Sequence, residues 1–220
     1  MYATVLDRPT ADFLRRWGAS PLSTSPWRLA GGTGLALQLG HRRSGDLDWF
    51  IYNSPQAPLA PLDEALARHF TSVVVDYRDD RTWRGLIDGV RAGWFAIAGR
   101  WLDPPVVLDG LPGVAVAGWR DLAVATFVAI GQSGTRREFI DLHILLDRLA
   151  WDLAALVAAT EEKFPGQPIN LMFYLKALTY FDDAEVEPMP MMLVRLSWRQ
   201  VRQAMERRVR AYIRELSASR

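Results

Sequence analysis

The residues best suited to chemistry lie between Gly31 and Asp48. Gly31, Gly32 and Thr33 form a Gly-Gly-Thr turn, and Asp46 and Asp48 follow after one short apolar segment. Side chains alternate faces along a strand, so both carboxylates should point the same way, about 6 to 7 Å apart. Two carboxylates on one face repel each other unless a divalent cation lies between them. Mg²⁺ suits this pair, because it leaves other positions for water and phosphate.

The glycines supply a second part of the same site. A Gly-Gly turn that enters a helix lets a phosphate approach the backbone, and the N–H groups at the helix N-terminus favour an anion. Thr33 can cap that helix or bond a phosphate oxygen. If the loop at 40–45 folds back, a triphosphate can span the turn and its metal can lie on Asp46 and Asp48. This arrangement suits nucleotidyl transfer. The alternative is an ordinary helix start followed by a solvated strand.

The elements around this stretch are expected to alternate between helices and strands. The apolar patterning predicts an N-terminal helix capped by Thr10, and an amphipathic helix at 61–70. The segment at 101–113, with three prolines and two glycines, is interpreted as a surface loop or linker. Further elements are a strand at 27–30, a helix at 33–41, and strands at 46–52, 71–78, 82–89 and 93–99.

After Trp119 the pattern becomes helical. The strands are expected to end near Val116, and all later segments carry helical periodicity. We therefore predict two domains, 1–117 with helices and strands and 118–220 with helices. The acidic cluster at 182–187 is interpreted as a solvated loop. The expected helices cover 119–130, 136–149, 152–164, 170–181 and 191–216.

Composition excludes several classes of site. The chain has 220 residues, half of them apolar, and a net charge of +1, which gives no bulk electrostatic case for nucleic-acid binding. All but two of the 26 basic residues are arginine; the lysines are Lys163 and Lys176. There is no cysteine, which removes disulfides, thiolate metal sites and cysteine nucleophiles. The N-terminus does not resemble a signal peptide, and no apolar run suits a membrane span. We expect a cytoplasmic protein.

The stretch from Gly31 through "LALQLGHRRSGDLDWF" resembles the first motif of the DNA polymerase β-like nucleotidyltransferase superfamily. More narrowly it resembles the AbiEii-type family, the toxins of type IV toxin–antitoxin systems. "RREFIDLHILL", from Arg136, resembles that family's later signature. The resemblance implies an α+β fold, in which a nucleotidyltransferase lobe with a mixed sheet precedes an all-helical lobe. It also implies Mg²⁺, a nucleoside triphosphate substrate and an RNA acceptor such as tRNA. An antitoxin or transcriptional regulator encoded nearby is an implied partner.

The resemblance assigns roles residue by residue. Gly31, Gly32 and Thr33 would hold phosphate, Asp46 and Asp48 would hold metal and act in catalysis, and Asp141 would be a catalytic acid from the helical lobe.

The sequence departs from the family pattern in two places. The family's lysine in the helix before the Asp-Leu motif is missing, and Thr126 stands near its expected place. Arg136 or Arg137 could supply the phosphate-binding charge instead. The third carboxylate of many relatives is not evident either; Asp76, Asp103 and Asp109 are the candidates near enough in sequence.

Three interpretations therefore stay open at this point. The chain is a nucleotidyltransferase acting on RNA, a degenerate transferase that only binds a partner, or a transferase acting on a protein or on a small hydroxylated or aminated molecule. Individual residues keep simpler interpretations too. Asp141 could form an intrahelical ion pair with Arg137. His41 could reach a phosphate at the proposed site or be an exposed histidine at a helix end.

Overall fold

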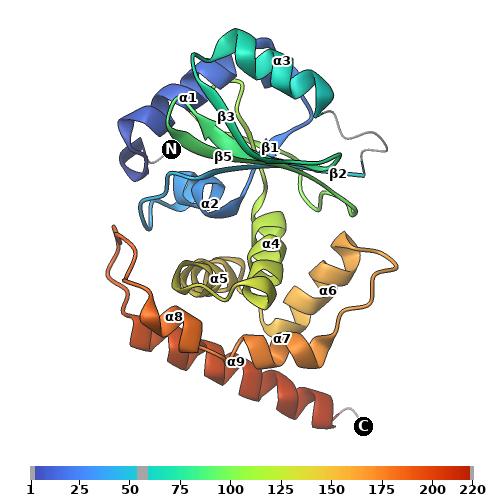
Figure 1. The fold of residues 1–220 in the computed structure, drawn as a ribbon. Coiled ribbons are helices and arrows are strands. Elements are labelled where there is room, and N and C mark those ends of the chain that lie inside the picture. Colours follow the sequence, from blue (N-terminus) through green and yellow to red (C-terminus); the bar gives the residue numbers. More distant parts are fainter. Residues whose placement is uncertain (1–2, 54–58, 219–220) are drawn as a thin grey trace. The chain divides into compact units, whose positions relative to one another are not determined.

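The computed structural model describes residues 3–53 and 59–218, and the chain divides into two compact units, Met1–Gly118 and Trp119–Arg220. The first unit holds the sheet with helices on it, and the second is built from helices (Figure 1). The division falls one residue from the domain boundary expected from the sequence. Each unit is described by itself.

The first unit is organised around a seven-stranded mixed sheet with the order β3-β4-β5-β2-β1-β7-β6. β2 runs parallel to β5 and β1 runs parallel to β7, whereas the other neighbours are antiparallel. The mixed sheet confirms the α+β expectation. The strands are β1 (Arg28–Leu29), β2 (Leu47–Tyr52), β3 (Val73–Arg78), β4 (Thr82–Ile87), β5 (Val90–Ile97), β6 (Val106–Val107) and β7 (Ala115–Val116).

Helices lie on both faces of this sheet. In Figure 1, α1 (Arg8–Ala19) and α3 (Ala60–His69) cover one face, and α2 (Gly31–Leu39) lies on the other. Two short 3₁₀ segments, η1 (Ala3–Val5) and η2 (Pro21–Thr24), flank α1. Under α1, Trp17 stacks on Trp49 with ring centroids 4.2 Å apart, and Trp49 is stacked with Trp94 at 6.3 Å. Much of the chain's tryptophan therefore fills this core.

β2 separates the core from the opposite face of the sheet. Its residues alternate, with Leu47, Trp49 and Ile51 buried and the residues between them half-buried. Asp48 thus lies on the face opposite the tryptophan core, because successive side chains on a strand point to opposite faces. This alternation therefore determines which side chains surround the carboxylate of Asp48.

The second unit contains six helices in its described residues. They are α4 (Trp119–Gln132), α5 (Arg136–Leu149), α6 (Leu153–Lys163), α7 (Leu171–Ala177), α8 (Asp182–Val186) and α9 (Trp198–Ala218). Thr135 and Glu138 form a capping box that begins α5. A fully buried ion pair between Lys163 and Asp121 joins the end of α6 to the first turn of α4.

The structure differs from the sequence-based expectation in four places. The first helix is capped by Asp7, whose carboxylate accepts from the Thr10 N–H at 2.9 Å, so Thr10 is not the cap. The loop at 101–113 contains β6, which pairs with β7 at the sheet edge. The acidic segment forms the short helix α8. Residues 191–197 are not helical. The last helix begins at Trp198, after the segment that contains Pro188 and Pro190.

Within residues 3–53 and 59–218, no helix combines the length and apolarity needed to cross a bilayer.

Candidate active site

The glycine turn and the carboxylate strand are in direct contact. The Ala30 N–H donates to the Asp48 carbonyl oxygen at 2.8 Å. A Cβ atom added to Gly31 would lie 2.7 Å from Oδ2 of Asp48. The Thr33 hydroxyl lies 2.5 Å from the carbonyl oxygen of Asp46. The structure therefore places the glycine turn against the Asp48 side chain and against the backbone of Asp46.

Local backbone geometry explains why the turn needs glycine. Gly31 has φ +57°, the left-handed region that L side chains rarely adopt, and it is the first residue of α2. The N-cap, Ala30, has no side chain able to bond the first N–H groups of the helix. Those N–H groups have no partner inside the helix. The N-terminus of α2 is thus a backbone surface suited to an anion.

Thr33 acts differently from the simplest expectation. It is buried, and its hydroxyl bonds the Asp46 carbonyl oxygen and lies 2.8 Å from the Ser44 hydroxyl oxygen. The side chain therefore ties α2 to the segment that carries the carboxylates, and its backbone N–H remains the group aimed at an anion.

The two aspartates differ in exposure. Asp46 is exposed and directly precedes β2, whereas Asp48 is half-buried within the strand. Across the sheet Asp48 is in register with Gly93 of β5. The ring of Phe95 lies over that glycine, since a Cβ on Gly93 would be 2.7 Å from it. The strand position beside Asp48 is therefore covered by the ring of Phe95 and carries no carboxylate.

None of the three candidates for a further carboxylate lies on β5. Asp76 is on the edge strand β3 and forms an ion pair with Arg91, and Asp103 and Asp109 follow β5 and β6. Throughout the described ranges, no group of three or more His, Cys, Asp or Glu side chains could hold a metal ion.

Two carboxylates next to a helix N-terminus fit Mg²⁺. Magnesium is commonly held by one or two carboxylates, with water and substrate phosphate completing its octahedron. Oδ2 of Asp48 lies against the glycine turn, at 2.7 Å from where a Cβ on Gly31 would be. The donor set is thus all oxygen, without the nitrogen or sulfur ligands that favour zinc.

The sheet face beyond Asp48 is aromatic. Phe50 and Tyr52 follow at alternate positions of β2, and Phe50 stacks on Phe95 with centroids 5.1 Å apart. Arg28, paired with Phe50 across β1 and β2, lies over the ring of Trp101. No sequence motif singles out these residues. The Asp48, Phe50, Tyr52 spacing already indicated a shared face, but the register with β5 and the position of Trp101 were needed to complete it.

The other three predicted residues lie on α5 of the helical unit. Asp141 is buried there, 4% exposed, among apolar neighbours. Arg137 is exposed. Arg136 donates from Nε to the Ala184 carbonyl oxygen at 2.8 Å and from Nη2 to that of Glu185 at 3.0 Å, so it fastens α5 to α8.

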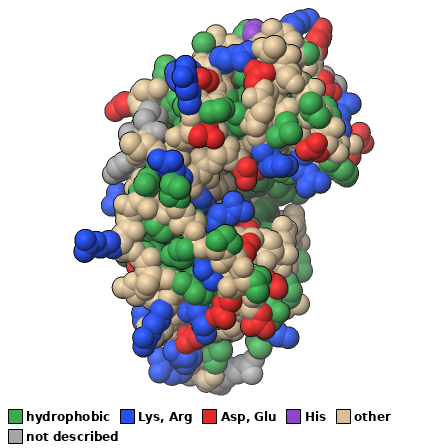
Figure 2. Space-filling model, turned by 60° about the vertical axis from the view of Figure 1, so that its left-hand side comes forward, with side chains coloured by type: hydrophobic (Ala, Val, Ile, Leu, Met, Phe, Trp, Pro, Cys, Tyr) green, Lys and Arg blue, Asp and Glu red, His purple; other side chains and the backbone are tan. Residues whose placement is uncertain are grey.

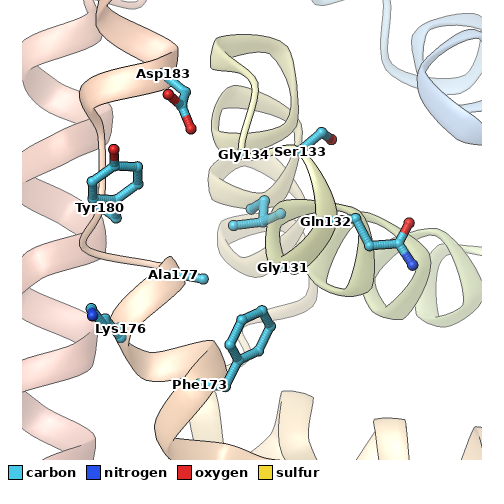
Figure 3. A pocket seen from close by; sticks show the side chains of 10 residues that line it. Gly131, Gln132, Ser133, Gly134, Phe173, Lys176, Ala177, Tyr180 and Asp183 are labelled. Atoms are coloured by element: carbon cyan, nitrogen blue, oxygen red, sulfur yellow. The ribbon is translucent and has the colours of Figure 1, made fainter.

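The structure shows the surroundings of Thr126, which stands near the place of the family's lysine, and of the chain's two lysines. The hydroxyl of Thr126 donates to the Leu122 carbonyl oxygen of its own helix at 2.8 Å. Lys163 is held in the buried pair with Asp121, and Lys176 lines a pocket of about 340 Å³ in the helical unit. Figure 3 shows this pocket between the end of α4 and α7–α8, with Phe173, Lys176 and Tyr180 on one side. It contains none of the predicted site residues.

His41 corrects another expectation. It is only 2% exposed and follows Gly40, whose left-handed backbone ends α2 and turns the chain inward. The interpretation of His41 as an exposed histidine at a helix end is therefore wrong.

The face drawn in Figure 2 shows no single cluster of basic side chains. On the face drawn in Figure 2, basic and acidic side chains are interspersed with apolar ones, in keeping with the net charge of +1.

Solved structures share this fold at low sequence identity. A provisionally assigned nucleotidyltransferase from H. pylori superposes with a TM-score of 0.58 at 14% identity, covering 97% of this chain and 99% of that one. JHP933 from Helicobacter pylori gives 0.54 at 14% identity, with 97% and 96% covered. MenT4, a nucleotidyltransferase toxin from Mycobacterium tuberculosis H37Rv, gives 0.50 at 16% identity, with 90% and 81% covered. These likenesses confirm the nucleotidyltransferase fold expected from the sequence.

Sequence comparison gives a nearer relationship. No family model matches the chain. An uncharacterised protein of Aquifex aeolicus (strain VF5), aq_aa25, is 31% identical over 195 residues, which cover 84% of this chain and 87% of that protein. The chain belongs to the same protein family as aq_aa25 of Aquifex aeolicus.

Proposed function

We propose that this protein is a Mg²⁺-dependent nucleotidyltransferase that moves a nucleoside monophosphate from a triphosphate to an acceptor RNA, such as a tRNA. The single observation that carries the proposal is the contact between the glycine turn and the carboxylate strand, with Gly31 packed against Oδ2 of Asp48. In this proposal the N-terminus of α2 would bind the anion and the two carboxylates would bind the metal, both on one triphosphate.

Each part of the site has a separate task. The backbone at Gly31, Gly32 and Thr33 would hold phosphate oxygens, and Asp46 and Asp48 would hold the cation. A bound cation supplies positive charge to the phosphates during transfer. The chain's own contribution is to fix the turn and the strand relative to each other, which positions the phosphorus for attack by an acceptor hydroxyl.

The roles on α5 are part of the same proposal. Asp141 would act as a catalytic acid, and Arg137, which is exposed on the first turn of α5, would offer charge to phosphate. The guanidinium of Arg136 is already committed to two backbone carbonyl groups.

Nucleotide binding tests the proposal directly. Each of the four ribonucleoside triphosphates is titrated with Mg²⁺ into the wild type, into Asp46→Asn and Asp48→Asn, and into the control Asp80→Asn, which changes an exposed aspartate between β3 and β4. We expect at least about tenfold weaker binding for the two site variants, because each removes a charged metal ligand. The control should bind like the wild type. Equal affinity in all four proteins would refute the proposed site.

A second candidate function rests on the missing lysine and on the glycine beside Asp48. In this alternative the chain keeps the fold and acts as a binding module without catalysis. Incorporation of labelled nucleotide separates the candidates. Label in RNA supports the transferase, triphosphate binding without incorporation supports the binding module, and label on a protein or small molecule indicates a different acceptor.

The biological setting belongs to the same proposal. We place the protein in the cytoplasm as an AbiEii-like toxin, countered by an antitoxin or regulator encoded nearby. The lack of cysteine is compatible with that compartment. Expression with and without the neighbouring gene tests it: growth arrest should occur only without the neighbour, and should disappear in Asp48→Asn.

A further inference from the structure

The face of the sheet that carries Asp48 continues as a row of aromatic side chains. Phe50 and Tyr52 follow Asp48 at alternate positions, so all three point to the same side, and Tyr52 stands about 13 Å from Asp48 along the strand. Phe95 of β5 is in register with Phe50. The side chains of Phe50, Tyr52 and Phe95 are half-buried. We name Phe95, Phe50, Tyr52 and Trp101 the aromatic row.

The rings of this row touch one another in sequence. Phe50 and Phe95 stack at 5.1 Å with planes 28° apart. Tyr52 meets Trp101 edge-on at 4.6 Å and 88°. Phe50 and Tyr52 stack at 6.5 Å with planes 13° apart, which joins the two pairs, so the row is continuous from the glycine beside the carboxylate to Trp101.

Arg28 adds a positive charge to the row. Its guanidinium carbon lies 4.2 Å from the ring centre of Trp101, and its Nη1 donates to the Asp103 carbonyl oxygen at 2.8 Å. The two contacts hold the cation flat against an aromatic ring. Guanidinium groups on aromatic surfaces are common where proteins bind nucleic acid.

The row begins at the carboxylate because Gly93 has no side chain. The ring of Phe95 lies over this glycine, next to Asp48 in register. Across the described strands β1, β2 and β5, Asp48 is the one acidic side chain on this face. Beyond the Asp46–Asp48 site, the described strands β1, β2 and β5 carry no further carboxylate on this face, whereas flat rings would find stacking partners along the row.

We propose that the aromatic row is a stacking platform for the terminal bases of a single-stranded nucleic-acid acceptor, whose end is thereby led to the Asp46–Asp48 site. This inference rests on the proposed function for the site, and it adds where the acceptor binds and by what chemistry. Base stacking on aromatic side chains tolerates sequence, because every base has a π-face. Sequence-independent recognition of an acceptor end is the expected result.

The test measures binding of a single-stranded RNA octamer of mixed sequence, labelled at its 5′ end, by fluorescence anisotropy. Phe50→Leu and Tyr52→Leu keep apolar volume and remove the π-face. Each should weaken binding about tenfold, the usual size of the loss of one stacked base. Phe50→Tyr keeps a ring and should bind like the wild type. Tyr180→Leu, which removes an exposed tyrosine of the helical unit, is the matched control.

Further arms identify the ligand. The same sequence as single-stranded DNA should bind comparably if stacking dominates, and a blunt RNA duplex should bind more weakly, since its bases are already stacked. An aminoglycoside should not compete. The inference is overturned if the wild type does not bind the octamer, if the two leucine variants bind as tightly as the wild type, if Tyr180→Leu causes the larger loss, or if the aminoglycoside displaces the RNA.

Triphosphate titration in the same proteins keeps this inference separate from the proposed function. The leucine variants should bind Mg²⁺–triphosphate normally, which also shows that they are folded, and Asp48→Asn should lose triphosphate while still binding the octamer. Normal triphosphate binding with no octamer binding refutes the platform only. Octamer binding that depends on the row, with no triphosphate binding in the wild type, refutes the transferase only.

Discussion

Gly31 and Asp48 approach so closely that a Cβ atom on the glycine would lie 2.7 Å from the Oδ2 atom of the aspartate. The two residues belong to different elements, α2 and β2, and neither could be replaced by a larger side chain without moving the other. The contact makes the turn and the carboxylate a single geometric unit, and it leads to the first prediction.

Gly31→Ala should abolish tight triphosphate binding. The substitution forces an L residue to φ +57° and drives its Cβ into the Asp48 carboxylate. Gly89→Ala is the matched control, because Gly89 has φ +81° and nothing within 4 Å of its added Cβ. Both variants should lose about 1 to 2 kcal/mol of unfolding free energy in urea. Only Gly31→Ala should weaken Mg²⁺–triphosphate binding, by at least about tenfold; equal binding by both variants would contradict the prediction.

Thr33→Val should loosen the carboxylate segment. It leaves the Asp46 carbonyl oxygen without the hydroxyl that lies 2.5 Å away. We expect a loss of about 1 to 2 kcal/mol in unfolding free energy and several-fold weaker triphosphate binding. Thr33→Ser keeps the hydroxyl and removes a buried methyl group, so it should cost about 1 kcal/mol of stability and preserve affinity. Wild-type affinity in Thr33→Val would disprove a positioning role for the hydroxyl.

Lys163→Met should strongly destabilise the protein. It removes the cation from the buried Asp121 carboxylate, which is 1% exposed. Breaking such a pair from one side costs about 3 to 5 kcal/mol. Combining it with Asp121→Leu should recover most of that loss, since the uncompensated charge is gone. Urea denaturation of both variants provides the check, and a double variant no more stable than the single one would show that the pair is not the cause.

His143 should make stability depend on pH. Burial lowers the pKa of His143 below its ordinary value of 6.5, the neighbouring Asp147 raises it, and Arg208 and Arg207 lower it further. The folded protein then binds fewer protons at this site than the unfolded chain. The contribution to stability is complete above pH 6.5 and is lost as the pH falls below 6.5 through the folded pKa.

His143→Gln tests this dependence. Unfolding free energy measured between about pH 5.5 and 7.5 should fall less steeply toward acid in the variant than in the wild type. An equal slope in both proteins would mean that His143 is not the responsible group.

Local patterns accounted for most of the fold. The alternation in β2 and the helical periodicity after Trp119 are properties of neighbouring residues, so a sequence displays them. Local patterns do not predict short elements such as β6 and α8, because these depend on partners far away in the sequence. β6 has only two residues and exists because β7 pairs with it, which no local pattern reveals. α8 has five residues and is fastened through Arg136 of α5.

The candidate site shows the same division. Gly31 and Asp48 could be linked from the sequence because one short helix separates them and the chain must return. The neighbour of Asp48 could not, because Gly93 reaches it through a parallel register that is set by the whole sheet. The burial of His41 depends likewise on how the loop after Gly40 packs. The features of the candidate site that the sequence did not predict are therefore those that depend on packing between distant segments.

The parallel pairing of β1 with β7 has a consequence for biosynthesis. Leu29 is in register with Val116, and the Ala117 N–H donates to the Leu29 carbonyl oxygen at 2.9 Å. The strand that leads into the glycine turn thus receives its second neighbour only after the ribosome has delivered almost the entire first unit. During translation this edge of β1 stays open, and completing it waits for the last segment before the helices.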